Sequence, residues 1–377
     1  MSLSQSESPV SSLFPWLGAS GVSFAMVFFV AASLAAILAL FTRRREGTLD
    51  PERVAGFGAR PSALRIVVAP VAVLTVIVAL PAWPVAMDGS IRVAAVQGNG
   101  AAGYFEGSTS DELIQAQVNA TMPLFGQDVD VVLWPEGSTF RDPTTDQYTG
   151  QVFDFISREM DAPLVAQGVT QRGDKIYNTA VLWKAGEGVV DFFDKRHPVP
   201  FGEYIPDRAF WRPFAPDLID LIQRDYTPGS TDLTFDINGV ITGITICFDI
   251  VDDQVLYDSV REGAQVLFAS SNNSDFGRTD ESVQQLAIAR IRAMELGRSL
   301  VNVSTVGITA VIAPDGSITA QLPWFTAGAL VEDVPLSTTV TPALVVGRQI
   351  EWSVSILGLA ALVMAGFIGR SGRRRDV

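Results

Sequence analysis

The chain has little of what builds covalent cross-links or metal sites. Its 377 residues include one cysteine and one histidine. One cysteine cannot form an internal disulfide, and one cysteine with one histidine cannot supply a zinc site. We therefore expect no metal site and no cofactor.

Basic residues are also scarce. Lysine and arginine total 27 and aspartate and glutamate total 41, giving a net charge of −14. Binding to nucleic acid depends on positive charge, so this composition excludes that class of partner. Charged residues make up 18% of the chain, against about 25% in an ordinary soluble domain. Part of the chain is therefore expected to avoid water.

The apolar residues are concentrated in three uncharged runs. Residues 21–41 could cross a hydrocarbon core of about 30 Å as a helix rising 1.5 Å per residue. Residues 66–87 contain prolines, which a membrane helix can accommodate, and residues 352–368 precede a group of arginines. The alternative for each run is a helix buried in a protein core. We expect three transmembrane helices.

The arginines predict the orientation of these helices. Residues 43–65 contain six arginines and three acidic residues, and residues 370–377 contain four arginines and one aspartate, so each segment has a net charge of +3. Positive loops stay in the cytoplasm. We expect a membrane region at residues 1–87, an acidic extracytoplasmic domain at residues 88–351, and a third helix with a cytoplasmic tail at residues 352–377. The chain would then be a multi-pass protein of the cell membrane.

Between residues 91 and 335, short apolar β-branched runs alternate with helical, charge-bearing stretches. This alternation is typical of an α/β sandwich. The expected strands are residues 91–97, 129–134, 164–169, 179–183, 240–247, 266–270, 300–303 and 309–313, and the expected helices are residues 110–121, 150–160, 254–262 and 282–297.

Three of the apolar runs end in chemically active side chains. Glu136 follows the run 132–135, Lys195 follows Phe192-Phe193-Asp194, and Cys247 follows Ile244-Thr245-Ile246. A carboxylate, an ammonium group and a thiol are the groups needed for acyl transfer through a thioester. Taken singly, each has a simpler interpretation, such as a buried inert thiol or a solvated surface charge.

The order of these residues and their neighbours is more specific than any one of them. The series 133–136 (Leu-Trp-Pro-Glu), 194–206 and 246–249 (Ile-Cys-Phe-Asp) resembles the nitrilase, or carbon-nitrogen hydrolase, superfamily. Within it, the segment Pro-Phe-Gly-Glu-Tyr-Ile-Pro at 200–206 is similar to the apolipoprotein N-acyltransferase family. Further similar segments are residues 176–180, 271–277, 284–298 and 303–310.

The resemblance implies a fold and a set of roles. The fold would be the α-β-β-α sandwich of nitrilases, flanked by transmembrane helices. Glu136 would be the general base, Lys195 would stabilise the thiolate and the oxyanion, Cys247 would be the nucleophile, and Glu203 would be a second essential carboxylate. The residues expected to contact substrate are Phe248, Asn178 and Phe276.

The resemblance also implies substrates and partners. The acyl donor would be a membrane phospholipid, and the acceptor would be the α-amine of the diacylglyceryl-cysteine of a lipoprotein. A polyprenol-phosphate mannosyltransferase is a candidate partner. The family usually has more membrane helices before this domain, so the chain is expected to be truncated or naturally short.

Two other functions remain open. A membrane-anchored amidohydrolase would pass through the same thioester, with water replacing the amine. A catalytically inactive membrane partner protein is the third possibility. Apolar runs on both sides of the domain favour acyl transfer, because they are useful when the substrate is itself in the bilayer.

The sequence also departs from the family pattern beside the cysteine: Phe248 and Asp249 stand where relatives often have Tyr and Glu.

Overall fold

The computed structural model describes residues 2–46, 71, 74–75, 79–103, 107–222 and 225–373. The chain divides into two compact units. Unit 1 comprises Met1–Trp83 and Val340–Val377, and unit 2 comprises Pro84–Thr339. The catalytic candidates all belong to unit 2.

Unit 2 contains two six-stranded sheets. The first has the order β12-β1-β2-β3-β4-β5, in which β1, β2 and β3 are parallel and the other neighbours are antiparallel. Its strands are β12 (Gly328–Pro335), β1 (Ser90–Gln97), β2 (Val131–Leu133), β3 (Leu164–Arg172), β4 (Lys175–Lys184) and β5 (Gly188–Asp194).

The second sheet repeats this plan. Its order is β11-β10-β9-β8-β7-β6, with β7, β8 and β9 parallel and the remaining neighbours antiparallel. Its strands are β11 (Ile318–Gln321), β10 (Ala310–Ile312), β9 (Ser299–Ser304), β8 (Val266–Ser271), β7 (Val240–Ile246) and β6 (Thr234–Ile237).

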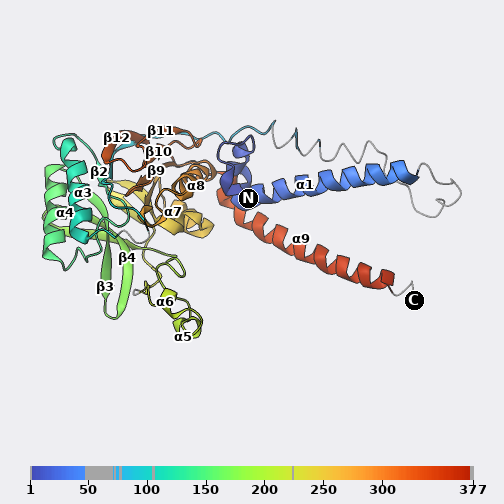
Figure 1. Ribbon diagram of the computed structural model, residues 1–377. Helices are drawn as coiled ribbons and strands as arrows, with labels where there is room; N and C mark the ends of the chain where they lie inside the picture. Colours follow the sequence, from blue (N-terminus) through green and yellow to red (C-terminus); the bar gives the residue numbers. More distant parts are fainter. Residues whose placement is uncertain are drawn as a thin grey trace. The chain divides into compact units, whose positions relative to one another are not determined.

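Helices cover the outer face of each sheet (Figure 1). On the first sheet lie α3 (Ser110–Thr121) and α4 (Gln147–Glu159), and on the second lie α7 (Asp253–Arg261) and α8 (Glu281–Leu296). Side chains fix where these helices start: Thr109 and Glu112 form a capping box for α3, and Asp146 and Asp252 cap α4 and α7. The α-β-β-α sandwich predicted from the sequence is confirmed.

The apolar core lies in two layers. One fills the space between the sheets with side chains from both, including Val93, Leu133, Ile246 and Phe268. The other lies between the first sheet and helices α3 and α4, where the Phe153 ring meets Trp134 and Trp183 edge-on at 5.7 Å. The interior layer brings strand ends of the two sheets close together.

The four expected helices are each found within a few residues of their predicted bounds. The strands β5, β6, β11 and β12 were not among the predicted strands. All four lie at sheet edges, and β5, β11 and β12 are only partly buried, so they lack the continuous buried run that marks a central strand. Cys247, predicted as the end of a strand, instead begins the 3-10 turn η5 (Cys247–Val251).

Short elements of unit 2 include the helices α5 (Arg208–Trp211) and α6 (Pro216–Ile219) and the 3-10 turns η4 (Met122–Leu124) and η6 (Ser274–Phe276). Unit 1 includes the 3-10 turns η1 (Ser2–Ser4) and η2 (Ser11–Leu13).

Unit 1 is built on two long helices, α1 (Phe14–Glu46) and α9 (Pro342–Arg373), which pack against each other. The predicted spans 21–41 and 352–368 lie inside them. Helix α9 begins upstream of the predicted span because Pro342 suits a first helical position and the Thr341 hydroxyl accepts from Leu344 N at 3.4 Å. Ten of the 22 residues of the predicted span 66–87 lie outside the described residues, and residues 80–87 are described without helix or strand.

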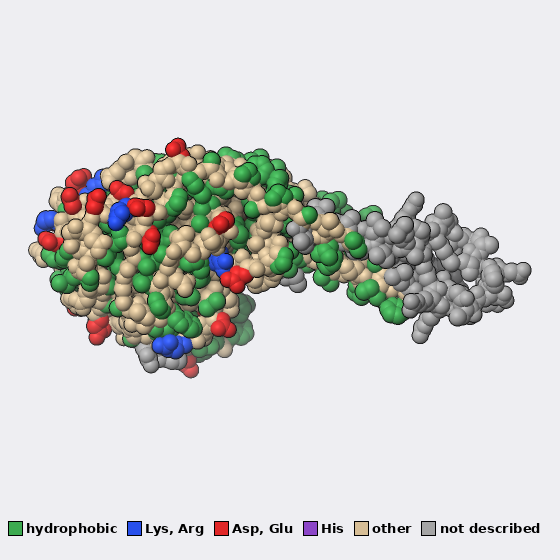
Figure 2. Space-filling model, turned by 90° about the horizontal axis from the view of Figure 1, so that it is seen from above, with side chains coloured by type: hydrophobic (Ala, Val, Ile, Leu, Met, Phe, Trp, Pro, Cys, Tyr) green, Lys and Arg blue, Asp and Glu red, His purple; other side chains and the backbone are tan. Residues whose placement is uncertain are grey.

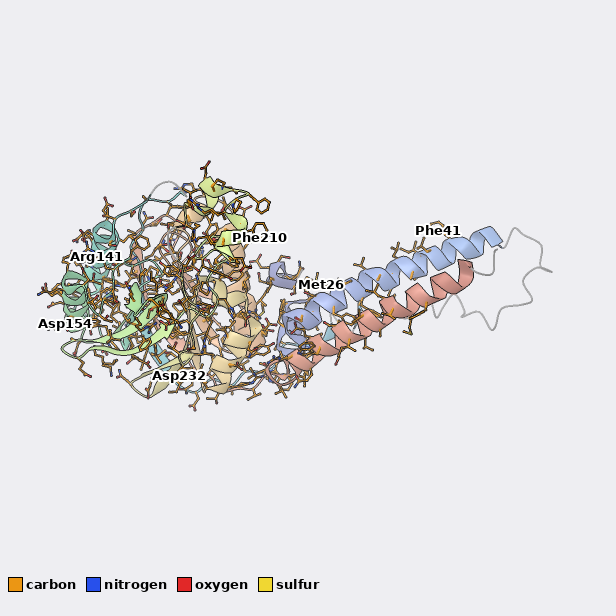
Figure 3. All side chains as sticks on the ribbon, turned by 90° about the horizontal axis from the view of Figure 1, so that it is seen from below. Met26, Phe41, Arg141, Asp154, Phe210 and Asp232 are labelled. Carbon is orange, nitrogen blue, oxygen red and sulfur yellow. The ribbon has the colours of Figure 1, made fainter. Side chains whose placement is uncertain are left out.

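Both helices expose apolar side chains. Ser11–Leu38 and Pro342–Met364 are long and apolar enough to cross a membrane, and large residues such as Phe41 and Leu362 are 62% and 73% exposed. Figure 3 shows Phe41 standing out from α1. Unit 2 differs: on the face drawn in Figure 2, acidic and basic side chains are scattered among uncharged ones.

Candidate active site

The predicted catalytic residues come from both sheets. Glu136 follows β2 and Lys195 follows β5 in the first sheet, whereas Cys247 follows β7 in the second. The buried side chains of Leu133 and Ile246, just before two of these residues, anchor the strand ends in the core between the sheets. The fold therefore brings together residues that are far apart in sequence.

Lys195 lies at the centre of the site. Its side chain is 1% exposed, and its Nζ is 3.2 Å from Glu136 Oε1 and 2.8 Å from Glu203 Oε2. Burial alone would lower the pKa of Lys195, but the negative charge around it, chiefly that of Glu136, outweighs burial and raises the pKa. The lysine is therefore a charged ammonium group at neutral pH.

Both glutamates are fixed by hydrogen bonds. Asn178 Nδ2 donates to Glu136 Oε1 at 2.8 Å and to Glu203 Oε1 at 3.0 Å, and Asn272 N donates to Glu136 Oε2 at 2.8 Å. The other end of the Asn178 amide accepts from Gln167. Asn178 was predicted to contact substrate. In the structure its amide group binds the two glutamates. Its contact with a substrate stays a prediction.

Glu203 is held by a tight turn. Its backbone N donates to Val199 O at 2.8 Å, while Val199 N donates to Glu203 Oε2 at 2.7 Å. Phe201, inside the turn, has a φ of 60°, a conformation that side chains other than glycine rarely adopt. The turn thus fixes the carboxylate without a regular helix or strand.

Cys247 has an uncommon backbone conformation. Its φ is 49°, in the left-handed region, at the junction of β7 and η5. Burial and the charge of Glu136 raise the pKa of the thiol well above its usual range, although Lys195 opposes this shift. Cys247 therefore rests as a neutral thiol within the electrostatic influence of Glu136, Lys195 and Glu203.

Asp249 connects the cysteine turn to the lysine segment. Its fully buried carboxylate accepts from Arg196 N at 3.1 Å and His197 N at 2.8 Å. Burial raises the pKa of Asp249 to about 6, although the positive charge of Lys195 and the two N–H groups oppose the shift. From the sequence, Asp249 was noted only as a departure from the Glu that relatives often have there. Its contact with His197 could not be predicted, because the two residues are 52 positions apart and leave no local pattern.

The two aromatic residues predicted to bind substrate lie at the surface. Phe248 is 45% exposed and Phe276 is 46% exposed. Both follow residues of the site closely in sequence: Phe248 comes directly after Cys247, and Phe276 lies in η6 soon after Asn272. Their contact with a substrate stays a prediction.

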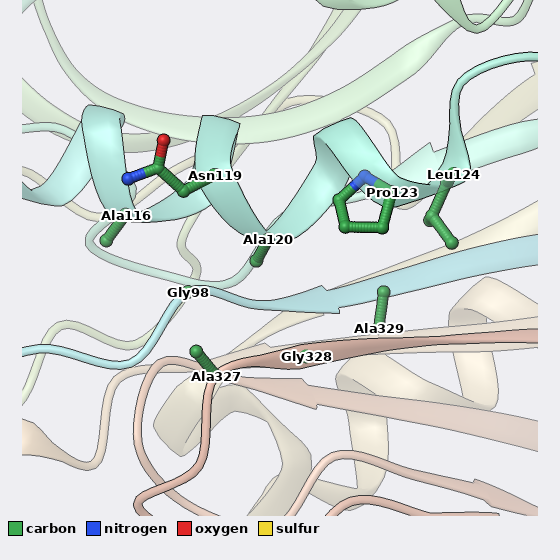
Figure 4. A pocket seen from close by; sticks show the side chains of 9 residues that line it. All are labelled: Gly98, Ala116, Asn119, Ala120, Pro123, Leu124, Ala327, Gly328 and Ala329. Atoms are coloured by element: carbon green, nitrogen blue, oxygen red, sulfur yellow. The ribbon is translucent and has the colours of Figure 1, made fainter.

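A separate hollow of about 450 Å³ lies beside α3 (Figure 4). Six of its nine lining residues are glycine or alanine, and none of the nine belongs to the cluster around Lys195: Gly98, Ala116, Asn119, Ala120, Pro123, Leu124, Ala327, Gly328 and Ala329. The hollow carries no side chain with the chemistry of the site.

The site thus has a buried ammonium group between two carboxylates, within electrostatic reach of a thiol at a strand end of a two-sheet sandwich. The family profile of carbon-nitrogen hydrolases matches residues 92–341, and the chain belongs to this family. Two solved structures share the fold: a CN-hydrolase superfamily protein of Xanthomonas campestris (TM-score 0.50, 17% identity) and Nit3 of Saccharomyces cerevisiae (0.51, 18%). Each comparison covers 66% of this chain and 91% of the other chain.

Curated relatives are more specific. The chain is 34% identical over 270 residues to the apolipoprotein N-acyltransferase of Mycolicibacterium smegmatis, covering 68% of this chain and 44% of that protein. It is 27% identical over 388 residues to the apolipoprotein N-acyltransferase of Shewanella oneidensis, covering 97% of this chain and 68% of the relative. The resemblance noted from the motifs is confirmed. The chain spans 44% to 68% of the lengths of these two relatives.

The raised pKa of Cys247 predicts a neutral thiol in the resting protein. The difference in absorbance at 240 nm between the wild type and a Cys247→Ala variant should stay flat beyond about pH 8.5, where an ordinary thiol ionises. Denatured wild-type protein is the control, because its thiol should ionise at the ordinary pH. A thiolate signal from the folded protein at pH 7 would contradict this prediction.

Proposed function

We propose that this protein transfers a fatty acyl chain from a membrane phospholipid, through a thioester on Cys247, to the α-amine of a lipoprotein's diacylglyceryl-cysteine. The main support is the buried Lys195 ammonium group between Glu136 and Glu203, within electrostatic reach of the thiol. The similarity to curated apolipoprotein N-acyltransferases supports the choice of substrates.

The first half-reaction forms the thioester. The sulfur of Cys247 attacks the ester carbonyl of the phospholipid while Glu136 takes the thiol proton, and Lys195 stabilises the oxyanion. When the carbonyl re-forms, the ester C–O bond breaks. The lysophospholipid leaves as an alcohol after receiving the proton from Glu136, so the carboxylate is ready for the next step.

The second half-reaction transfers the acyl group. A neutral amine attacks the thioester carbonyl, a C–N bond forms, and the C–S bond breaks. Glu136 takes a proton from the attacking nitrogen and returns it to the sulfur of Cys247, which regenerates the resting thiol. No oxidant or metal is needed to balance either step.

Exposed aromatic residues beside the site suit a lipid substrate. Between β5 and β6, Phe210, Trp211 and Phe214 are 59%, 41% and 73% exposed, and Phe201 meets Trp211 at 5.7 Å. Figure 3 shows Phe210 at the periphery of unit 2. A patch of this kind on a soluble surface is unfavourable unless a lipid or partner covers it.

The proposed location is the cell membrane, with unit 2 on the extracytoplasmic side. The two apolar helices α1 and α9 support membrane insertion, and the net charge of +3 in residues 43–65 supports the orientation. Association with a polyprenol-phosphate mannosyltransferase rests only on the family resemblance, and co-purification from native membranes would test it.

The acyl intermediate is the most direct test. Incubating the full-length protein with a phospholipid carrying a labelled acyl chain should give a hydroxylamine-labile adduct on Cys247, detected by mass spectrometry. The Cys247→Ala variant should carry none, and equal labelling of it would overturn the proposal. Adding a diacylated lipopeptide should move the label to its amine. Release of free fatty acid alone would instead favour the amidohydrolase-type reaction.

Glu203 should act through Lys195. The substitution Glu203→Gln removes the charge that lies 2.8 Å from Lys195 Nζ, so turnover per folded protein should fall about tenfold or more, with the folded fraction measured by thermal melting. The exposed Glu187→Gln is a matched control and should match the wild type. Unchanged turnover in Glu203→Gln would show that the reaction does not need the Glu203 carboxylate.

A thiol-labelling scan tests the orientation. In a Cys247→Ala background, which has no other thiol, a cysteine placed between residues 43 and 65 should resist a membrane-impermeant reagent in intact cells. A cysteine replacing the exposed Lys175 of unit 2 should react. The opposite pattern would reverse the proposed topology.

A further inference from the structure

The turn that carries Cys247 is anchored at more than one point. The φ of 49° at Cys247 is unfavourable for a residue with a Cβ atom, so surrounding contacts must hold it. On one side, Asp249 ties the turn to the backbone of Arg196 and His197, directly after Lys195. This contact fixes the middle residue of η5 but not its last residues.

Arg292 of α8 holds the last residues of the turn. Its Nε donates to Ile250 O at 2.9 Å and its Nη2 donates to Val251 O at 2.6 Å. The same guanidinium pairs with Glu295 Oε2 at 2.5 Å and Asp253 Oδ1 at 2.6 Å. All three of its nitrogen atoms are engaged, and the arginine is fully buried.

A third side chain completes the network. Tyr257 of α7 donates its hydroxyl to Glu295 Oε1 at 2.7 Å, and Glu295 is itself fully buried. The chain Tyr257–Glu295–Arg292 therefore runs from one covering helix to the other and ends on the carbonyl groups of η5.

A buried network of charged side chains is an energetically unfavourable way to join two helices. Removing charges from water is expensive, and replacing a buried ion pair with well-packed apolar residues is often neutral or stabilising. What apolar residues cannot do is satisfy the two carbonyl groups of η5 in a fixed direction. The planar guanidinium has donors in a rigid fork, which suits two adjacent carbonyl groups and two carboxylates at once.

We propose that Arg292, held by Glu295 and Tyr257, is a positioning residue that fixes the turn Cys247–Val251 and thereby aims the Cys247 thiol at the acyl carbonyl. This inference rests on the proposed function for the role of Cys247 as nucleophile. The polar partners of Arg292 described above are two carbonyl groups of η5 and two carboxylates, none of them among the proposed catalytic residues. Its effect should therefore appear in the rate of attack rather than in substrate affinity.

The test uses three variants of the full-length protein. Arg292→Lys keeps a positive charge but cannot reach both carbonyl groups and both carboxylates. Tyr257→Phe removes only the hydroxyl that holds Glu295, so it should fold even if the first variant does not. Arg298→Lys is the matched control, because Arg298 is also buried and donates to backbone carbonyls of Ala264 and Thr339, away from η5.

A single-turnover time course of acylation by labelled phospholipid separates positioning from folding. The amplitude gives the fraction of protein molecules that can be acylated, and the rate constant gives how fast Cys247 is acylated in those molecules. Arg292→Lys should lower the rate constant about tenfold or more, because small displacements of a reacting group cost large factors in rate. Tyr257→Phe should lower it less, Arg298→Lys should leave it unchanged, and KM for phospholipid should stay near the wild-type value in all three.

Two results would overturn the inference. One is a wild-type rate constant in Arg292→Lys and Tyr257→Phe with a lower amplitude, which would reduce Arg292 to a scaffold residue. The other concerns alkylation of Cys247 by iodoacetamide, which needs no acyl transfer. A wild type that forms no acyl adduct would contradict the proposed function but not the positioning role of Arg292. The positioning role would then be supported by an alkylation rate that changes in Arg292→Lys and not in Arg298→Lys. Equal alkylation rates in the wild type and Arg292→Lys would contradict the positioning role.

Discussion

The site depends on the buried ammonium group of Lys195. A lysine removed from water is unfavourable unless opposite charge and hydrogen bonds compensate it, and here two carboxylates lie within 3.2 Å of its Nζ. Each partner comes from a different part of the chain: Glu136 from the end of β2 and Glu203 from the turn after Lys195. Because the charges compensate one another, the side chains are already in place before any substrate arrives.

The sandwich makes the geometry of the site a consequence of core packing. Glu136 and Lys195 follow strands of the first sheet and Cys247 follows a strand of the second, so the apolar layer between the sheets sets the separation of the proposed base and the proposed nucleophile. The hydrogen bond from Asn272 N to Glu136 Oε2 joins the sheets directly at the site. A change deep in this layer would therefore alter the reaction without touching a catalytic residue.

The sequence predicted what local patterns encode. Glu136 and Cys247 could be found because each follows a continuous buried run, and the motif around Glu203 is rigid and distinctive. Edge strands such as β12 were missed because half-exposed strands resemble loops. The contacts of Asn178 with the glutamates and of Arg292 with η5 could not be predicted, because their partners come from other elements. For Arg292, a charged residue in a helix also usually indicates a solvent-facing position.

A neutral thiol beside a charged lysine links the two proposed catalytic roles. In the resting site Lys195 is compensated by Glu136 and Glu203, leaving little of its charge for an oxyanion. In the proposed attack, Glu136 accepts the proton of Cys247 and becomes neutral, so the ammonium group loses one charged partner when negative charge develops on the carbonyl oxygen. The oxyanion takes the place of that carboxylate, so the net charge around Lys195 is conserved through the attack. The two proposed roles are therefore coupled: protonation of Glu136 makes the charge of Lys195 available to the oxyanion.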